Sequence, residues 1–170
     1  MAGKRTLSRE LITTTALGVV ARDGVAALSM RRLAQELDVW PMSVYRHFRD
    51  KEDLLDAVAA AGADEVAMPR ARGGGPERVA ALATEARALL ERQPSELRRR
   101  ALTSPGLGRL GDAAREALAE GGMAPAEAAL AWRAVLAYVI GSIELDAGAE
   151  ASKNDFEEGL KRVLRGTISA

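Results

Sequence analysis

Apolar and polar positions alternate with the period of a helix along almost the whole chain, and strand patterns are nearly absent. Residues 8–22 place apolar side chains three or four positions apart, after Ser8 as an N-cap and before Gly24 as a stop. Ser29 is the N-cap of a second, shorter helix, and Asp38 follows it at a position suited to a left-handed turn. The pattern predicts an all-α fold.

The next elements lead to a domain boundary. Pro41 fits the first turn of a short helix to about residue 47, and another helix is expected from Asp50 or Lys51 toward Met68. The segment PRARGGGP, residues 69–76, is typical of a linker, because three successive glycines lie between two prolines. We therefore expect a first domain over residues 1–66, a linker over 67–75 and a second domain over 76–170.

The second domain is expected to consist of helices alone. The periodicity predicts helices over 76–92, 95–102, from a break at 105–108 to about Glu120, over 125–148 and over 154–167.

The segment 125–148 is apolar on most sides, with Arg133 as the only charge in its central part. Such a helix must be buried on most sides, and in a small domain a second copy of the chain is the simplest cover. The last helix carries an apolar stripe and can complete a four-helix dimer interface. The expected interface residues are Val135, Val139, Ile143, Phe156, Leu160, Val163 and Leu164. The alternative is the ordinary core of a monomer.

Composition favours a soluble cytoplasmic protein without a membrane segment. The 170 residues include no cysteine, which excludes disulfides and thiolate zinc sites. The N-terminus lacks the uninterrupted apolar core of a secretory signal. The apolar stretch from Ala134 to Ile143 is about half as long as a membrane span requires.

The net charge of zero is unevenly distributed. Residues 1–51 contain nine Lys or Arg and five Asp or Glu, a net charge of +4, so the remainder carries −4. A basic N-terminal third weakly favours a polyanionic partner, because basic side chains that bind phosphates release counterions.

Enzymatic chemistry fits the sequence poorly. The chain has one histidine and no cysteine, and the glycines at 73–75 lack the preceding strand and following Lys-Ser/Thr of a phosphate loop. Glu144, Asp146 and Glu150 lie close in sequence but lack the spacing of a metal site. We expect no catalytic residue, no cofactor and no metal.

Residues 28–58, LSMRRLAQELDVWPMSVYRHFRDKEDLLDAV, resemble the N-terminal DNA-binding region of the TetR family of transcriptional regulators. The similarity extends over about residues 8–66; the remainder agrees in architecture and length. The resemblance implies an all-helical homodimer, each chain with a helix-turn-helix domain followed by a domain that senses a small ligand and dimerises.

The geometry of a helix-turn-helix identifies candidate DNA contacts. The second short helix can enter a major groove about 12 Å wide, so its N-terminal side chains can reach base edges. The candidates are Trp40, Pro41, Met42 and Ser43, with Arg46 directed to a guanine or a phosphate. The resemblance adds phosphate contacts for Tyr45, His47 and Lys51, and a base or phosphate contact for Arg31. The alternatives are a structural role for His47 and a partly buried Trp40 that staples the start of the helix. Many members of the family have a small capping serine at the position of Trp40.

The expected function is that of a repressor that binds a palindromic double-stranded operator as a homodimer. A small, largely apolar effector in the second domain would release it. The expected pocket walls, which can equally be plain core, are Leu82, Ala86, Leu89, Trp132, Leu136 and Tyr138. The alternatives are a helical dimerisation or adaptor module without effector response, and a helical-bundle enzyme.

Overall fold

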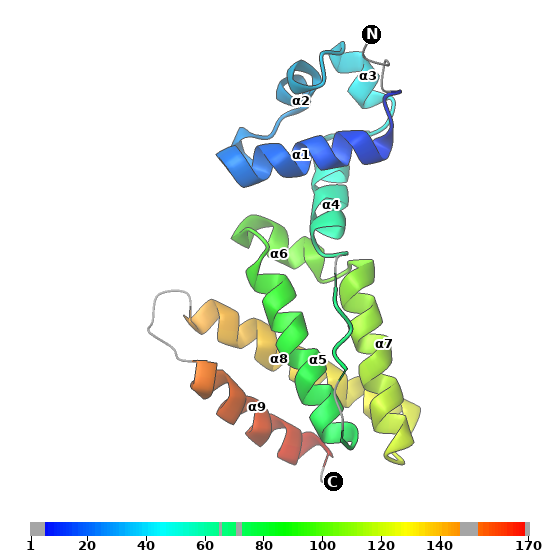
Figure 1. The fold of residues 1–170 in the computed structure, drawn as a ribbon, viewed down its shortest axis with the longest axis vertical. Coiled ribbons are helices and arrows are strands. Elements are labelled where there is room, and N and C mark those ends of the chain that lie inside the picture. Colours follow the sequence, from blue (N-terminus) through cyan, green and yellow to red (C-terminus); the bar gives the residue numbers. More distant parts are fainter. Residues whose placement is uncertain (1–5, 65, 71–72, 147–152, 169–170) are drawn as a thin grey trace. The chain divides into compact units, whose positions relative to one another are not determined.

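The computed structural model describes residues 6–64, 66–70, 73–146 and 153–168, and all regular elements in these ranges are helical (Figure 1). The helices are α1 (Arg9–Asp23), α2 (Met30–Glu36), α3 (Pro41–Tyr45), α4 (Lys51–Gly62), α5 (Gly75–Glu91), α6 (Ser95–Ala101), α7 (Pro105–Glu120), α8 (Pro125–Asp146) and α9 (Lys153–Ile168), with a 3₁₀ turn at Val25–Ala27. The predicted all-α fold is confirmed.

Local capping explains the helix starts and stops of the N-terminal part. The Ser8 hydroxyl accepts a hydrogen bond from the Leu11 N–H at 3.1 Å, and the Ser29 hydroxyl accepts one from the Arg32 N–H at 3.1 Å. Gly24 ends α1 with φ at 82°, and Asp38 has φ at 51° in the turn after α2. Each of these predicted caps and turns is confirmed.

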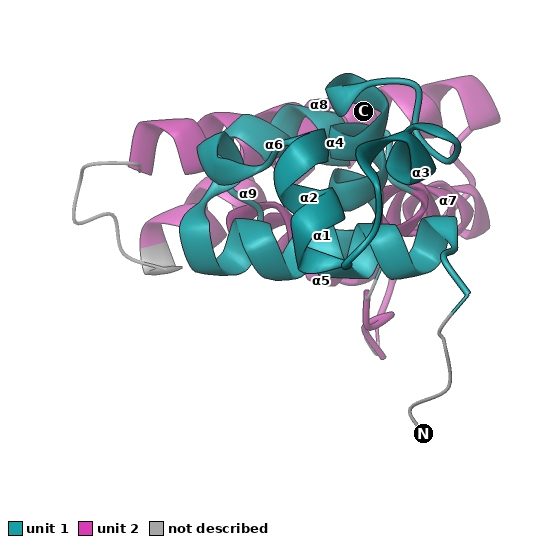
Figure 2. Ribbon diagram, turned by 90° about the horizontal axis from the view of Figure 1, so that it is seen from above, with its two compact units in different colours: residues 1–65, 93–104 teal, residues 66–92, 105–170 magenta. Residues whose placement is uncertain are grey.

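The chain divides into two compact units, which Figure 2 distinguishes by colour. The first contains residues 1–65 and 93–104, and the second contains residues 66–92 and 105–170. The segment 93–104, which carries α6, therefore belongs to the first unit, whereas the sequence-based boundary assigned it to the second domain.

The first unit is built around a continuous apolar core. In it α1 packs against α2 and α4, and α6 packs against α4 (Figure 1). Side chains with no exposed area fill the centre, namely Ile12, Leu28, Leu33, Val44, Phe48, Leu54 and Val58. Leu97 brings α6 into the same core, and Arg100 of α6 forms ion pairs with Glu52 and Asp56 of α4.

Two helix limits differ from the prediction. Helix α4 ends at Gly62 and not near Met68, because glycine is a poor helix former and Asp64 is an unfavourable charge at a helix C-terminus. The amide of Gln93 occupies the space where a side chain at 62 would lie. The expected break at 105–108 is instead the first turn of α7, since Pro105 needs no N–H there.

The second unit is a helical bundle. Helices α5 and α7 lie side by side, α8 packs against both, and α9 packs against α8 and α5 (Figure 1). Close approach of α7 and α8 depends on Gly111, because a Cβ there would lie 2.8 Å from Nε1 of Trp132. The same kind of contact joins α8 to α9, where the Tyr138 ring lies directly on Gly159.

Candidate DNA-binding surface

The second helix of the helix-turn-helix presents two different faces. Val44 of α3 is fully buried, as is Phe48 just after it, and both anchor the helix to the core of the first unit. The turn before it is closed by a hydrogen bond from the Val39 N–H to the Ala34 carbonyl at 2.9 Å. This anchoring fixes which side chains of α3 face outward.

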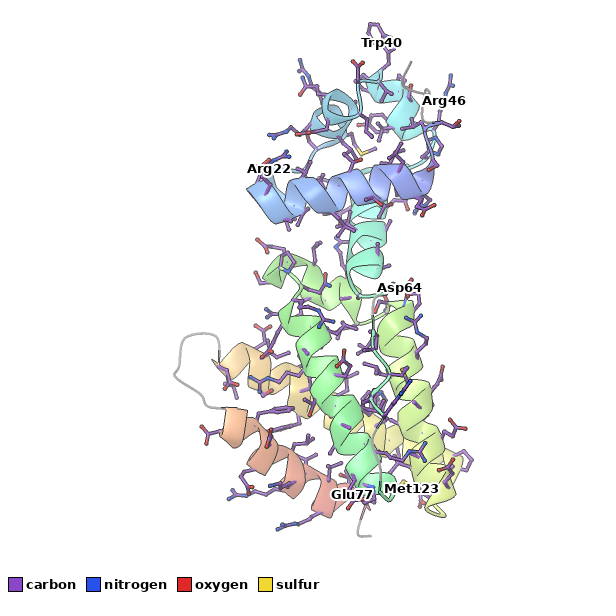
Figure 3. All side chains as sticks on the ribbon, viewed as in Figure 1. Arg22, Trp40, Arg46, Asp64, Glu77 and Met123 are labelled. Carbon is purple, nitrogen blue, oxygen red and sulfur yellow. The ribbon has the colours of Figure 1, made fainter. Side chains whose placement is uncertain are left out.

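The outward face of α3 is unusually apolar. Trp40 is 83% exposed, Met42 68% and Tyr45 45%, and Figure 3 shows Trp40 projecting away from the helices of its unit. Pro41 is exposed as well, and Ser43 is half-buried. Large exposed apolar side chains so close together mark an interaction surface and not a folding requirement.

Trp40 lies at the N-cap of α3, and no side-chain hydrogen bond caps this helix. The cap is formed by backbone alone, with the Ser43 N–H donating to the Trp40 carbonyl at 2.8 Å. The indole borders a hollow of about 500 Å³, together with Ala34, Gln35, Asp38 and Val39. The exposure of Trp40 argues against the alternative of a partly buried staple.

Three cations of the helix-turn-helix region have no carboxylate partner in the described part of the chain: Arg31 of α2 and Arg46 after α3, both exposed, and Lys51, half-buried at the first turn of α4. The neighbouring arginines, in contrast, are paired with carboxylates. Arg32 pairs with Asp23 at 2.8 Å, and Arg22 pairs with Glu36 at 2.6 Å, in a network that joins the end of α1 to α2. The free cations are thus those best able to attract an anion.

The loop between α3 and α4 is held in place by Arg9 of α1. The Arg9 guanidinium donates to the His47 carbonyl oxygen at 2.5 Å and to Asp53 Oδ1 at 2.7 Å, and it lies 4.0 Å from the centre of the Phe48 ring. The hydrogen bond from Arg9, with that from the Arg49 N–H, lowers the pKa of Asp53 below its usual value. Half-buried His47 is positioned through its backbone, so its ring stays available. The sequence analysis did not find Arg9, because a contact across this separation has no local signal.

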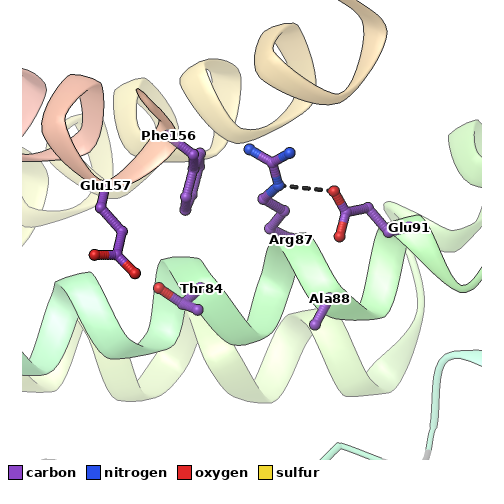
Figure 4. A pocket seen from close by; sticks show the side chains of 6 residues that line it. All are labelled: Thr84, Arg87, Ala88, Glu91, Phe156 and Glu157. Atoms are coloured by element: carbon purple, nitrogen blue, oxygen red, sulfur yellow. Dashed lines mark hydrogen bonds and ion pairs between the residues drawn. The ribbon is translucent and has the colours of Figure 1, made fainter. Parts of the chain in front are cut away.

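The residues expected to wall an effector pocket lie inside the second unit. Leu82, Ala86, Leu89 and Trp132 are buried and Leu136 and Tyr138 half-buried. None of them lines a cavity of about 390 Å³ that lies between α5 and α9 of this unit (Figure 4). That cavity is lined by Thr84, Arg87, Ala88, Glu91, Phe156 and Glu157. Their role as pocket walls stays a prediction, because burial is common to core residues and to the walls of an internal pocket.

Most of the expected interface residues also face inward. Val135, Val139, Ile143, Phe156, Leu160 and Leu164 are buried within their own unit, and Val163 is half-buried. The exposed apolar side chains of α8 lie on another face: Leu130 is 60% exposed and Leu145 82%, with exposed Ala134 and Ala137 between them.

Helix α8 is long and apolar enough to cross a membrane by length and composition alone. Of its most apolar stretch, 33% is buried inside the structure. Its packing against α5, α7 and α9 identifies it as a bundle helix, and core helices of soluble proteins meet the same criterion.

Acidic residues do not form a metal site among the described residues. Asp146, one of three considered from the sequence, instead accepts a hydrogen bond from Arg87 at 2.8 Å. Glu150 lies outside the described residues.

Comparison with known proteins finds a family that matches the N-terminal part of the chain. Residues 12–58 match the family described as bacterial regulatory proteins, tetR family. An HTH-type transcriptional regulator of Saccharopolyspora erythraea is 33% identical over 147 residues, which cover 84% of this chain and 62% of the relative. The chain thus spans somewhat less than two thirds of that relative's length.

Solved structures agree over nearly the full chain. A structure of BioQ with its natural double-stranded DNA operator has a TM-score of 0.79 at 26% identity, covering 97% of this chain and 100% of that one. A TetR variant from Acinetobacter baumannii AYE, in complex with minocycline, has a TM-score of 0.75 at 27% identity, covering 95% and 96%. The chain is thus similar to bacterial regulatory proteins of the tetR family in sequence over residues 12–58, and to a solved TetR structure in fold over nearly its full length.

Proposed function

We propose that this protein is a transcriptional repressor that binds a palindromic operator as a homodimer and is released by a small effector. The observation that carries the proposal is the surface of α3, where Trp40, Met42 and Tyr45 are exposed, in a helix-turn-helix region whose cations Arg31, Arg46 and Lys51 have no carboxylate partner among the described residues. Apolar groups that can meet bases, together with cations that can meet phosphates, suit a DNA groove.

Base recognition is proposed to rest on unusual chemistry. The first turn of α3 offers no Arg, Asn or Gln for a bidentate contact, and the Ser43 hydroxyl and the Trp40 indole N–H are its side-chain hydrogen-bonding groups. Exposed Trp40, Pro41 and Met42 can contact thymine methyl groups, and Arg46 can reach a guanine edge or a phosphate. The preference for a sequence therefore depends on thymines and DNA shape as well as on Arg46 and Arg31.

The phosphate contacts are assigned to Tyr45, His47 and Lys51. Tyr45 is partly exposed at the end of α3, and Lys51 lies on the first turn of α4, where the helix dipole also attracts anions. These contacts position the protein and make the affinity depend on salt concentration.

Dimerisation is assigned to the exposed apolar face of α8, namely Leu130, Ala134, Ala137 and Leu145. This set replaces the interface expected from sequence, because a second copy cannot cover side chains that their own unit already buries. Small residues in its centre permit close helix approach. Binding to a palindromic operator requires that the two α3 helices of the dimer lie about 35 Å apart, one turn of DNA.

Effector release requires a coupling free energy between the second unit and DNA binding. The structure of the TetR variant from Acinetobacter baumannii AYE contains minocycline, which supports a ligand site in this fold but does not identify the ligand of this chain. The cytoplasm is the compartment in which such a regulator meets its operator.

A gel-shift titration against DNA flanking the protein's own gene tests the proposal. The wild type should prefer one site over a shuffled sequence, and Tyr45→Ala and Lys51→Ala should weaken binding and each lower the salt slope by about 1. Lys161→Ala in α9, which removes an exposed cation paired with Glu158, serves as the control. Absence of sequence preference at every salt concentration would refute the repressor; binding that no metabolite releases would refute only the sensor and favour the adaptor alternative.

A further inference from the structure

The segment that joins α3 to α4 carries or adjoins two of the proposed phosphate contacts, His47 and Lys51. Its residues, 46–50, lie outside both helices, so helical hydrogen bonds alone do not fix its conformation. A segment that had to become ordered on DNA would lose affinity, because its conformational entropy is lost on binding. The bonds that hold this segment in the free protein therefore bear on DNA binding.

His47 is bonded through both of its backbone groups. Its N–H donates to the Val44 carbonyl at 3.0 Å, and its carbonyl oxygen accepts from Arg9 Nη1 at 2.5 Å. The same guanidinium lies 4.0 Å from the ring centre of Phe48, which is fully buried. With both backbone groups bonded, the direction of the His47 ring is left to its two side-chain torsions.

Asp53 ties Arg9 to the other end of the segment. Its Oδ1 accepts from Arg9 Nη2 at 2.7 Å, and its Oδ2 accepts from the Arg49 N–H at 3.0 Å. The Asp53 N–H in turn donates to Asp50, the N-cap of α4, at 2.8 Å. Since Lys51 directly follows this cap, its backbone position depends on the same set of bonds.

The charge of Arg9 is already matched within the protein. The side chain of Arg9 is 50% exposed and that of its partner Asp53 only 16%, whereas the three cations described above have no carboxylate partner among the described residues. A paired guanidinium gains less from a phosphate than an unpaired one does. We infer that Arg9 is a positioning residue for DNA binding: together with Asp53 it holds His47 and Lys51 where they can meet phosphates, without contacting DNA itself.

This inference rests on the proposed function, and Asp53 gives it a distinctive sign. Replacing Asp53 by Asn removes a negative charge near the proposed phosphate contacts, and by long-range electrostatics alone this would strengthen DNA binding. The same change weakens the hydrogen bonds from Arg9 and from the Arg49 N–H, because a carboxylate is a stronger acceptor than an amide. Positioning therefore predicts weaker binding, the opposite of the effect of charge.

Fluorescence anisotropy on the full chain tests the inference with two labelled duplexes, DNA flanking the protein's own gene and its shuffled version. Phosphates are common to both, so Arg9→Gln and Asp53→Asn should each weaken both complexes by about fivefold. The salt slope should stay unchanged, whereas a lost phosphate contact would lower it by about 1. Circular dichroism verifies that each variant is folded at the temperature of the titration.

Arg22→Gln is the matched control. Arg22 is another exposed arginine of α1, and it pairs with Asp23 and Glu36 at the other end of that helix. The substitution removes the same charge from the same helix without touching the segment. It should change the affinity by less than about twofold, as is usual for exposed ion pairs.

Combined variants distinguish positioning from a merely structural role. In a His47→Ala background, Arg9→Gln should lose about half of its effect or more, because part of that effect acts through His47. In an Arg31→Ala background the effect should be retained in full, since Arg31 lies on α2. A loss of general stability would act equally in both backgrounds.

Unchanged affinity of Arg9→Gln, a salt slope lowered by about 1, tighter binding of Asp53→Asn, or equal effects in the two backgrounds would overturn the inference. These outcomes are separable from the repressor hypothesis, because they are measured on both duplexes. Equal affinity of the wild type for the two duplexes refutes the repressor alone, and wild-type affinity of Arg9→Gln for a preferred duplex refutes positioning alone. Binding of neither duplex refutes both.

Discussion

Arg9, on the first turn of α1, and Asp53, on the first turn of α4, are joined by a 2.7 Å hydrogen-bonded ion pair across 44 positions of sequence. The same guanidinium holds the His47 carbonyl, so the loop that follows the proposed recognition helix is fixed by a residue far before it. The placement of α3 thus depends on α1 as well as on the turn that precedes α3.

The first prediction concerns Asp53→Asn. The folded-state pKa of Asp53 is lowered, chiefly by the hydrogen bond from Arg9, so its ionised form stabilises the fold above the unfolded-state pKa of about 3.9. This contribution is lost as the pH falls through the lower folded-state pKa. Urea unfolding at pH 7, 5 and 3 should show the variant less stable at pH 7 and 5, and the difference should shrink at pH 3. Glu116→Gln, an exposed change on α7, is the control; a difference independent of pH would contradict the prediction.

The second prediction concerns the apolar face of α3. Replacing single operator thymines by uracil removes only a methyl group, which is worth about 0.8 kcal/mol when buried, or roughly fourfold in affinity. Some such replacements should weaken the wild type, and the same replacements should have no effect on Trp40→Ala or Met42→Ala. Met68→Ala, at an exposed methionine outside the helix-turn-helix, should retain the wild-type response. If uracil operators bind the wild type as well as thymine operators do, thymine methyls are not read.

The third prediction concerns the proposed dimer face of α8. Ala137→Glu and Leu130→Glu place a charge where a second copy would cover it, and a buried unpaired charge costs about 3 kcal/mol or more. Sedimentation velocity should show the dimer dissociation constant raised by about 100-fold or more. Met68→Glu introduces the same charge at an exposed apolar position off α8 and should leave the dimer intact. A dimer unaffected by both α8 variants would exclude this face.

The fourth prediction compares two glycines of α9. A Cβ at Gly159 would overlap the Tyr138 hydroxyl oxygen and lie 2.7 Å from Cζ, and the ring cannot move freely because it stacks on Phe156. Gly159→Ala should destabilise the protein by about 1 to 3 kcal/mol. Gly166→Ala meets nothing within 4 Å and should be neutral or stabilise by up to about 1 kcal/mol, since alanine favours helix. Thermal unfolding of both variants measures this; equal stability of the two would contradict the close contact.

The sequence predicted well what depends on neighbouring residues. Ser8, Gly24 and Ser29 set helix ends through hydrogen bonds and dihedral angles within one turn, and Asp38 provides the left-handed turn in the same way. The exposure of Trp40 and Met42 also followed, because so short a helix anchored by Val44 and Phe48 leaves little choice of face.

What depends on distant partners could not be predicted. Helix α8 is apolar on most sides, so its pattern does not indicate which side packs on its own unit. Val135 and Val139 were therefore expected in a dimer interface, whereas their own unit buries them. The cavity was missed because its lining is partly polar, with Arg87 and Glu91, whereas apolar periodicity indicates only the faces that pack.

The division of the first unit into two stretches of sequence has a consequence for synthesis. Leu97 belongs to the same apolar core as Leu54 and Val58, and Arg100 forms ion pairs with two carboxylates of α4. When only residues 1–65 have left the ribosome, the segment 93–104 that completes this core has therefore not yet emerged. The first unit therefore reaches its full stability only after α5 and α6 have also emerged.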